Sequence, residues 1–409
     1  MTTLPGRRMV LKGIAAGLIV ATSALGVSAT RAQDITLTVW DYYGPEPMPS
    51  YLKLLTDFTA ETGIKVERVA IAYDDFLTKI LQGAAANKLP DIILIDNPWN
   101  SAMADQGVLA DLTDKVQTWG QFDHFFPGPA ASATWEGRIY GVPHLSNCLI
   151  MYYNKDMFDA AGLQPPTTWE EFNHAAEVLT KDGVFGFSTA MNRSENAVFV
   201  FEALLWQAGA DLDSLTSPGA LQAMNHLVDL VKKGHLSSES LNWDLRDGVS
   251  QLVNGRSAMA FQGTWDLNFV RDNMKAKWDV ALLPAGPVKQ SSNLGGENWS
   301  ITSTTPHFEE AWKFVEFVSD VDRLTPDLVA SGQLPSRGDI AAPEFKAHPL
   351  DIAVQQLAVA GARVYGPNYP EMADALMLAY QTAISGQATP EQALATAAAK
   401  IEPLLPRSP

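Results

Sequence analysis

Cysteine is almost missing from the sequence, which has 409 residues and one cysteine, Cys148. A single thiol excludes an internal disulfide and a thiolate metal cluster, and the apolar run Cys148–Met151 predicts a small buried side chain rather than a catalytic nucleophile. The sequence also lacks a Gly-x-Ser-x-Gly elbow, a His-Glu-x-x-His motif and a phosphate-binding loop, and its seven histidines are scattered. We therefore expect no catalytic residue, no metal and no cofactor.

Positive charge is also scarce. The chain has 29 Lys and Arg residues against 46 Asp and Glu residues, which gives a formal net charge of −17. An acidic surface repels nucleic acids and anionic lipid headgroups, so neither is an expected partner. The hydrophobic fraction of 46% and the charged fraction of 18% are typical of a globular protein, and the length allows two lobes with separate cores.

Long apolar runs are confined to the N-terminus. Arg7 and Arg8 precede an apolar stretch over 14–27, which is too short for a stable helix across a bilayer. A basic start, an apolar core and the small residue Ala32 predict a cleavable export signal over residues 1–32. The paired arginines are typical of a twin-arginine signal, and an ordinary export signal is the alternative. We expect a soluble mature protein in the periplasm, beginning near Gln33.

After this segment, strand and helix patterns alternate. The order β-α-β-α-β indicates an open parallel sheet, and the alternation resumes after residue 168. A mature chain of roughly 375 residues exceeds a comfortable single core, so two α/β lobes are expected. The first five elements are predicted at 35–39, 52–63, 64–70, 76–84 and 91–96.

Polar and aromatic residues follow two of these strands. The strand over 91–96 ends at Asp96, Asn97 and Trp99, and the first strand ends at Trp40 and Asp41. Ligands of open α/β sheets bind in the crevice beyond the carboxyl ends of the strands. Carboxylates and amides form pairs of hydrogen bonds with sugar hydroxyl groups, and an indole covers the apolar face of a pyranose ring. The pattern therefore predicts a sugar-binding crevice.

The mature chain resembles a known family over nearly its whole length. Each motif is weak alone, but their order and spacing are similar to those of the extracellular solute-binding proteins of bacterial ABC importers, in particular the family 1 carbohydrate binders. The motifs are LTVWDYY at 37–43, and those at 89–96, 107–112, 137–143, 152–156, 165–172, 263–265, 295–299 and 334–337.

The resemblance implies a two-lobed periplasmic-binding-protein fold of type II-like architecture. Each lobe would hold a mainly parallel sheet flanked by helices, and three crossing segments would act as a hinge. The implied crossings lie near Pro143–Asn147, Leu283–Gly286 and Leu334–Arg337. The N-terminal lobe would comprise 33–143 plus 285–335, and the C-terminal lobe 144–284 plus 336–409.

The resemblance also implies further ligand contacts, each with a structural alternative. Trp265, in the turn Gly263-Thr264-Trp265, would stack on a sugar, and Gly295 and Gly296 would bring backbone close to it. The other candidates are Asn147, Glu297, Trp299 and Arg337. Trp40 could instead pack between the lobes, Trp99 could pack under the following helix, and Trp299 could continue its strand inward. Asn147 could bond the hinge backbone, and Arg337 could form a hinge salt bridge.

The resemblance implies a monomeric binding protein that closes on a mono- or oligosaccharide and delivers it to membrane permease subunits. An alternative is an anionic or modified sugar, such as a sulfonated or phosphorylated glycoside, bound through Arg337. A third hypothesis is a glycoside hydrolase that uses Asp96 and Glu297 as its carboxylate pair. The sequence alone does not fix the separation of these two carboxyl groups.

Overall fold

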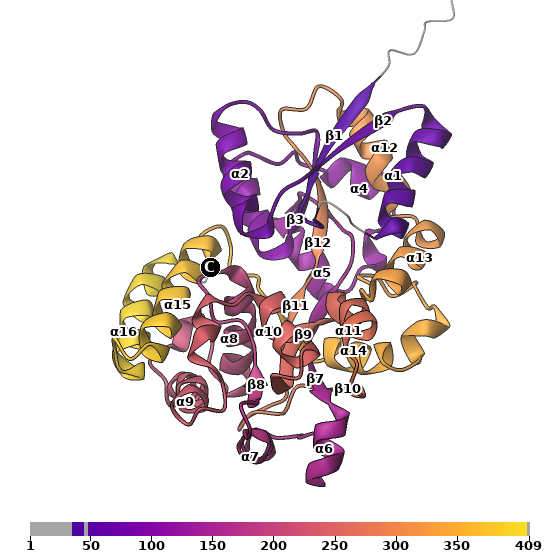
Figure 1. Cartoon of the computed structure of the whole chain (residues 1–409). Helices are drawn as coiled ribbons and strands as arrows, with labels where there is room; N and C mark the ends of the chain where they lie inside the picture. The colour runs from indigo at the N-terminus through magenta and orange to yellow at the C-terminus, as the bar shows by residue number, and fades with distance from the viewer. Residues whose placement is uncertain (1–34, 45–47, 407–409) are drawn as a thin grey trace, which may run out of the picture. The chain divides into compact units, whose positions relative to one another are not determined.

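The computed structural model describes residues 35–44 and 48–406. The export signal predicted at 1–32 lies outside the described residues. None of the helices in the described ranges has the length and apolar character needed to cross a membrane. The segment from Thr36 onward folds as one unit, in which two α/β lobes are joined by short connections (Figure 1). The predicted two-lobed α/β fold is therefore confirmed.

The first lobe is built around a five-stranded sheet in the order β2-β1-β3-β12-β6. Strands β1, β2 and β3 run parallel, as the β-α-β-α-β pattern predicts, whereas β12 runs antiparallel to β3. Helices flank this sheet and cover its apolar residues (Figure 1). The elements are β1 (Thr36–Asp41), α1 (Pro49–Thr62), β2 (Lys65–Ala70), α2 (Tyr73–Ala85), β3 (Ile92–Asp96), β6 (Val142–Pro143), β12 (Glu297–Ile301) and α12 (Phe308–Val318).

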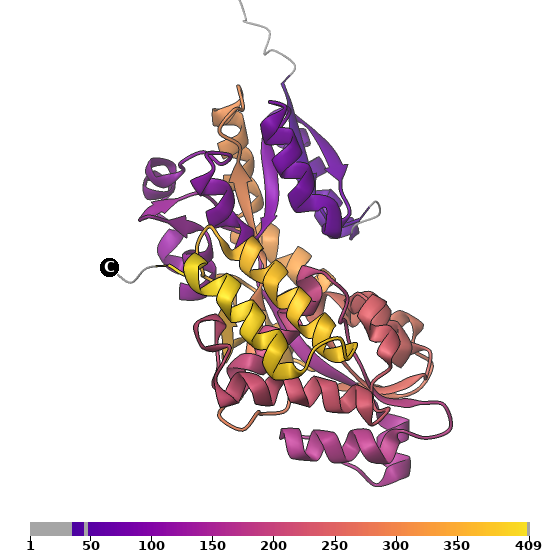
Figure 2. The same cartoon turned by 90° about the vertical axis from the view of Figure 1, so that its left-hand side faces the viewer.

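The second lobe has a six-stranded sheet in the order β13-β11-β7-β9-β8, with β10 also paired to β7. Helices α15 and α16 lie side by side over one part of this lobe, and α9 packs against both (Figure 2). The elements are β7 (Asn147–Asn154), α7 (Trp169–Leu179), β8 (Phe185–Ser188), α8 (Glu195–Gln207), α9 (Pro218–Lys232), α10 (Leu245–Val253), β9 (Ser257–Gly263), β10 (Trp278–Ala281), β11 (Ser292–Gly295), β13 (Ala360–Ala362), α15 (Tyr369–Ile384) and α16 (Pro390–Ile401).

The expected mainly parallel sheets each contain one reversed strand, β12 in the first sheet and β7 in the second. In the second sheet, β7 runs antiparallel to β9, β10 and β11. A parallel neighbour requires a crossover connection, usually a helix. Strands β7 and β12 are instead entered directly from the other lobe, so each runs against its neighbour, and both sheets are mixed.

Local signals in the sequence place several helix ends correctly. The sequence Thr168-Trp169-Glu170-Glu171 has the capping-box pattern that predicts a helix start. The Thr168 hydroxyl accepts a hydrogen bond from the Glu171 amide at 3.2 Å, and α7 begins at Trp169. Ser217 caps α9 in the same way, with Pro218 in the first turn. Gly63 ends α1 with a φ of 75°, which is a left-handed conformation that favours glycine.

The chain passes between the two sheets where three segments lie together. Gly295 still pairs with Asn147 in the second sheet, whereas Glu297 already pairs with Asp96 in the first. The middle passage therefore lies at Gly295–Glu297, later in the chain than the expected Leu283–Gly286. Gly296 has a φ of 137°, and an added Cβ would meet the Leu145 carbonyl oxygen at 2.2 Å, so only glycine fits there.

The third segment, Leu334–Arg337, lies beside the first. Ser146 and Leu334 form an antiparallel bridge, and each backbone amide donates to the other carbonyl at 2.8 Å. The order of the strands identifies the two lobes, but the lobe bounds at 285 and 335 stay a prediction.

Candidate functional site

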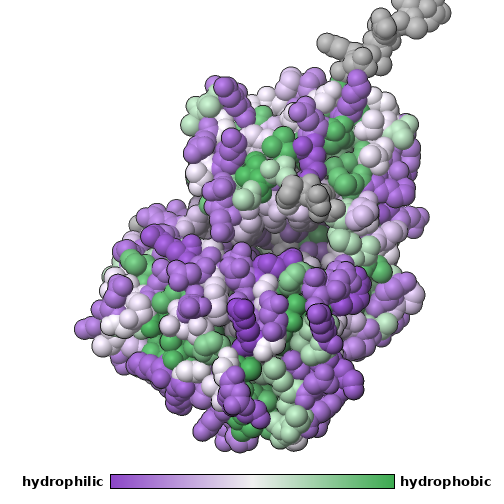
Figure 3. Space-filling model, viewed as in Figure 1, coloured by the Kyte–Doolittle hydropathy of each residue, from purple (hydrophilic) through white to green (hydrophobic). Residues whose placement is uncertain are grey.

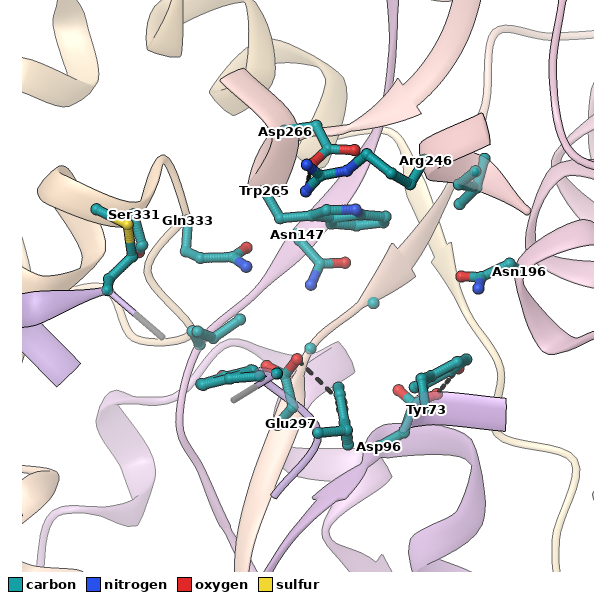
Figure 4. Close-up of a pocket in the computed structure, with 18 of the residues that line it drawn as sticks. Tyr73, Asp96, Asn147, Asn196, Arg246, Trp265, Asp266, Glu297, Ser331 and Gln333 are labelled. Atoms are coloured by element: carbon teal, nitrogen blue, oxygen red, sulfur yellow. Dashed lines mark hydrogen bonds and ion pairs between the residues drawn. The ribbon is translucent and has the colours of Figure 1, made fainter. Parts of the chain in front are cut away.

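A cleft of about 580 Å³ lies between the two lobes. Figure 3 shows the surface hollowed at this level, between the upper and the lower part of the molecule. Figure 4 shows the side chains that face the cleft from both lobes. Six of the residues predicted to contact a ligand line it, namely Asp96, Asn147, Trp265, Gly295, Gly296 and Glu297.

Asp96 lies at the end of β3 on the first-lobe side of the cleft, with 5% of its surface exposed. The Tyr73 hydroxyl donates a hydrogen bond to its Oδ2 at 2.7 Å. The Arg363 Nη2 atom, from the second lobe, lies 3.9 Å from Oδ1. Burial raises the pKa of Asp96, and Arg363 and the Tyr73 hydrogen bond oppose that rise.

Glu297 begins β12 and lies directly opposite Asp96 in the antiparallel register, so both side chains are on the same face of the sheet. The Tyr42 hydroxyl donates to Glu297 Oε1 at 3.0 Å, and Oε2 has no hydrogen-bond partner among the described residues. Burial, followed by the charge of Asp96, raises the pKa of Glu297 to about 8. Two acids therefore meet on one side of the cleft.

Trp265 faces these acids from the second lobe. It follows β9 in a short 3-10 turn, Thr264–Asp266, and its indole lies over the cleft near Asn147 (Figure 4). An added Cβ at Gly263 would lie 2.1 Å from the indole, so glycine is required for the indole to lie this close to the strand. The Phe199 ring lies 6.1 Å from it, between ring centroids. One aromatic face is thereby presented toward the cleft.

Two arginines that line the cleft, Arg246 and Arg363, were not predicted from the sequence. Arg363 forms an ion pair with Glu195 and lies over the Phe199 ring at 4.8 Å from its centroid. Arg246 forms an ion pair with Asp266 and lies 4.2 Å from the Phe269 ring centroid. Arg363 directly follows the short strand β13, and Arg246 lies in the first turn of α10, but neither element is among those predicted from the sequence. Both are already paired with acids.

Other cleft residues were also missed. Tyr42 and Tyr43 directly follow the first strand, so their place after Asp41 is a signal that could have identified them. Tyr73, Asn196 and Gln333 come from helices and loops whose position depends on the tertiary fold.

Four predicted residues near the ends of β1 and β3 do not line the cleft. Trp40 packs toward α2, and its ring lies so close to Gly83 that a Cβ added there would be 3.1 Å from it. The Asp41 carboxylate is fully buried and accepts hydrogen bonds from Arg68 at 2.6 Å and from the Tyr51 hydroxyl at 2.9 Å. Asn97 is buried, and Trp99 stacks on Tyr73 with 5.3 Å between ring centroids. Trp40, Asp41 and Trp99 each contact residues of the first lobe, and the Asn97 amide donates to the Gly296 carbonyl at 3.0 Å.

Trp299 and Arg337 also lie away from the cleft. Trp299 is fully buried, and its ring is parallel to Tyr51 at a centroid distance of 6.4 Å. Arg337 is 1% exposed, and its guanidinium donates to both Asp339 carboxylate oxygens at 2.6 and 2.7 Å. The structural alternatives given for these residues, an inward position on its strand for Trp299 and a salt bridge for Arg337, describe their positions.

The cleft offers both donors and acceptors to a ligand. Buried atoms without a hydrogen-bond partner in the described structure include Glu297 Oε2, Gln333 Oε1 and Arg363 Nε, and all three residues line the cleft. Buried polar atoms are normally paired, so a ligand or water is expected to satisfy them. Within residues 35–44 and 48–406, no group of three or more His, Cys, Asp or Glu side chains could hold a metal ion.

Comparison with known proteins gives consistent matches. A lactose-binding protein of Rhizobium radiobacter is 24% identical, covering 80% of this chain and 81% of its own. A solute-binding protein of Thermotoga lettingae, solved with α-D-tagatose, is 27% identical with a TM-score of 0.82 and covers 91% of this chain and all of its own. The maltose-bound MalE3 of T. maritima is 26% identical with a TM-score of 0.84 and the same coverage.

The family model of bacterial extracellular solute-binding proteins matches residues 53–353. This range includes most of helix α1, the three segments between the lobes and most of the cleft residues. The chain belongs to the family of bacterial extracellular solute-binding proteins.

Proposed function

We propose that the protein captures a mono- or oligosaccharide in the cleft by closure of the two lobes and delivers it to the membrane permease of an ABC importer. One observation carries the proposal. Asp96 ends β3 and Glu297 begins β12, so both lie at the same end of two neighbouring strands of the first sheet. They face Trp265 and Asn147 of the second lobe across a cleft of about 580 Å³. Acids, an amide and an indole that converge from two lobes suit a polyhydroxylated ring.

Trp265 is proposed as the stacking platform. Covering roughly 50 Å² of a sugar face would contribute about 1 kcal/mol at about 25 cal/mol/Å². Asp96, Glu297 and Asn147 would pair with hydroxyl groups, and the backbone at Gly295 and Gly296 would lie against the ligand. These six residues are proposed as the ligand contacts, because they line one cleft from both lobes.

The ligands in the names of the similar proteins support a saccharide. For the three similar proteins described above they are lactose, maltose and α-D-tagatose, and these three sugars are neutral. The anionic alternative was based on Arg337, which is engaged by Asp339 outside the cleft. The two cleft arginines, Arg246 and Arg363, are themselves paired with acids. A neutral sugar therefore remains our first choice.

We propose that the protein binds its ligand without altering it. The family and the similar structures are binding proteins, and the hydrolase alternative has only the pair Asp96 and Glu297 to support it. We further propose export through the signal predicted at 1–32, a periplasmic location and a monomeric state. The closed form would then contact the permease, and a separate subunit would hydrolyse ATP.

Thermal-shift measurements with a panel of neutral and phosphorylated sugars test the proposal. A ligand at a hundred times its Kd adds about 2.7 kcal/mol of stability, which is a clear shift in Tm. We expect at least one neutral saccharide to stabilise the protein and to be recovered unchanged by chromatography. Stabilisation by none of the panel would contradict capture of a sugar, and recovery of cleaved product would favour the hydrolase.

A further inference from the structure

Glu297 has an unusual environment for a buried acid. It is 4% exposed, and no ion pair among the described residues includes it. Tyr42 donates a hydrogen bond to Oε1, whereas Oε2 has no partner. Figure 4 shows the carboxyl group turned toward the cleft. An isolated buried carboxylate is costly unless a cation or several donors stabilise it. Here the hydroxyls of Tyr42 and Tyr43 are the groups that lower the pKa of Glu297, and neither carries a positive charge.

Asp96 occupies the opposite register position but has more support for a negative charge. Its Oδ2 accepts the Tyr73 hydroxyl at 2.7 Å, and Arg363 lies 3.9 Å from Oδ1. Two carboxyl groups that share a buried site do not both ionise readily. The better-supported Asp96 therefore keeps the charge, and Glu297 holds the proton.

The remaining groups around this pair do not change the assignment. His144, whose backbone amide donates to the Glu297 carbonyl at 2.7 Å, is fully buried, and burial lowers its pKa to about 3, so it is neutral. Burial raises the pKa of Tyr42, Tyr43 and Tyr73, so these phenols are neutral as well. The titratable or charged groups of the surrounding elements are Tyr42, Tyr43, Tyr73, Asp96, His144, Asp327 and Arg363. Arg363 is the cation among them, and Asp96 faces it.

We propose that Glu297 meets the ligand as a neutral carboxylic acid, whose Oε2 hydroxyl donates a hydrogen bond to an acceptor oxygen of the saccharide. The proposal rests on the proposed sugar-binding function for its ligand but concerns the state of one side chain. It makes Glu297 a specificity-determining residue, because the ligand must place an acceptor, rather than a donor alone, at this point of the cleft.

A dependence on pH follows from this assignment. The pKa of Glu297 is raised to about 8 by burial and by Asp96. If only the protonated side chain binds, the affinity is constant below pH 7 and falls about tenfold per pH unit above pH 8, as expected for one proton. A carboxylate that accepts sugar hydroxyls predicts the opposite, since its affinity rises as the group ionises.

Calorimetric titration with maltose, lactose and D-tagatose between pH 6 and pH 10 tests the binding mode. Glu297→Gln is the matched variant, because the amide keeps the shape and a donor but cannot ionise. We expect the wild-type affinity to fall above pH 8 while the affinity of the variant, whatever its value, does not change with pH. Asp96→Asn removes the like charge and so lowers the pKa of Glu297, and the affinity of this variant should begin to decline at a lower pH than that of the wild type. Parallel profiles of wild type and Glu297→Gln would overturn the proposal.

A measurement without ligand separates this proposal from the proposed function. The folded-state pKa of Glu297 is raised, so its contribution to stability is present below its unfolded pKa near 4.5 and is lost as the pH rises to about 8. Urea unfolding from pH 4 to pH 9 should show the wild type losing stability relative to Glu297→Gln across this window. A constant difference would overturn the protonated Glu297 even if sugars bind. The expected pH trend supports it even if none of the three sugars binds.

Discussion

Asp41 and Asp96 end neighbouring parallel strands of one sheet, yet the fold uses them differently. Asp41 is fully buried and bound by Arg68 and Tyr51, whereas Asp96 lines the cleft with Tyr73 and Arg363 nearby. The strand beside each acid explains the difference. β2 brings Arg68 to Asp41, while β12 brings Glu297 to Asp96.

The comparison shows that an acid at a strand end is not by itself a ligand contact. A neighbouring strand that supplies a cation turns the acid into a structural anchor, since the pair satisfies both charges inside the lobe. A neighbouring strand that supplies another acid does not neutralise the first one. The Oε2 atom of Glu297 then has no hydrogen-bond partner in the described structure and is available to a ligand in the cleft. The partner of the acid, rather than its place on the strand, indicates its role.

Asp41→Ala should have the largest effect and tests the anchor. Removing one member of a buried ion pair leaves Arg68 and Tyr51 without their acceptor, so the free energy of unfolding should fall by about 3–5 kcal/mol. Urea denaturation at neutral pH measures this loss. The double variant Asp41→Ala/Arg68→Ala should lose less than the sum of the two single changes, because the charges compensate one another. A loss below 1 kcal/mol would remove the distinction between the two acids.

Asp96→Ala tests the other side of the comparison. A hydrogen bond to a charged group contributes about 1.5–3 kcal/mol, so we expect saccharide affinity to fall about ten- to a hundredfold. Stability should fall less than in Asp41→Ala, because Arg363 keeps its ion pair with Glu195. Calorimetry of folded protein gives the affinities. An equal loss of affinity in Asp41→Ala, corrected for the folded fraction, would contradict the separation of roles.

Trp265→Ala and Trp40→Ala extend the comparison to two indoles near strand ends, Trp265 after β9 and Trp40 near the end of β1. Loss of about 1 kcal/mol of stacking at Trp265 should weaken saccharide binding about fivefold. Trp40 packs toward α2, so its replacement should leave the affinity unchanged while lowering Tm. Titration of both variants with the same sugar provides the check. Equal weakening by the two changes would show that Trp265 is not a specific platform.

Sequence reasoning reached the fold through local patterns. The apolar run Ile92–Ile95 predicts a buried strand, and the capping motif at Thr168 predicts a helix start. Both signals depend only on residues close together in the sequence, and the structure has β3 and the start of α7 at these positions. It did not identify the direction of β7 and β12, because direct entry from the other lobe is a property of the whole chain. The family resemblance implied a crossing at Leu283–Gly286, but the strand pairing places the passage at Gly296.

The site was predictable only in part for the same reason. Trp40 and Trp265 both lie near a strand end in the sequence, yet only Trp265 lines the cleft. Asp41 could not be separated from Asp96, because Arg68 lies 27 residues from Asp41 in the sequence and only the β1–β2 register brings them together. Arg363 and Asp96 are far apart in the sequence, so no local sequence pattern predicts that their side chains lie close together.

Calorimetric titration of the wild type and Asp96→Ala with maltose, lactose and D-tagatose measures whether the acid that lines the cleft contacts a sugar. We expect saturable one-to-one binding of at least one sugar by the wild type, with affinity reduced at least tenfold in the variant. Undiminished binding by a folded Asp96→Ala protein, or no heat of binding with any of the sugars, would contradict this expectation.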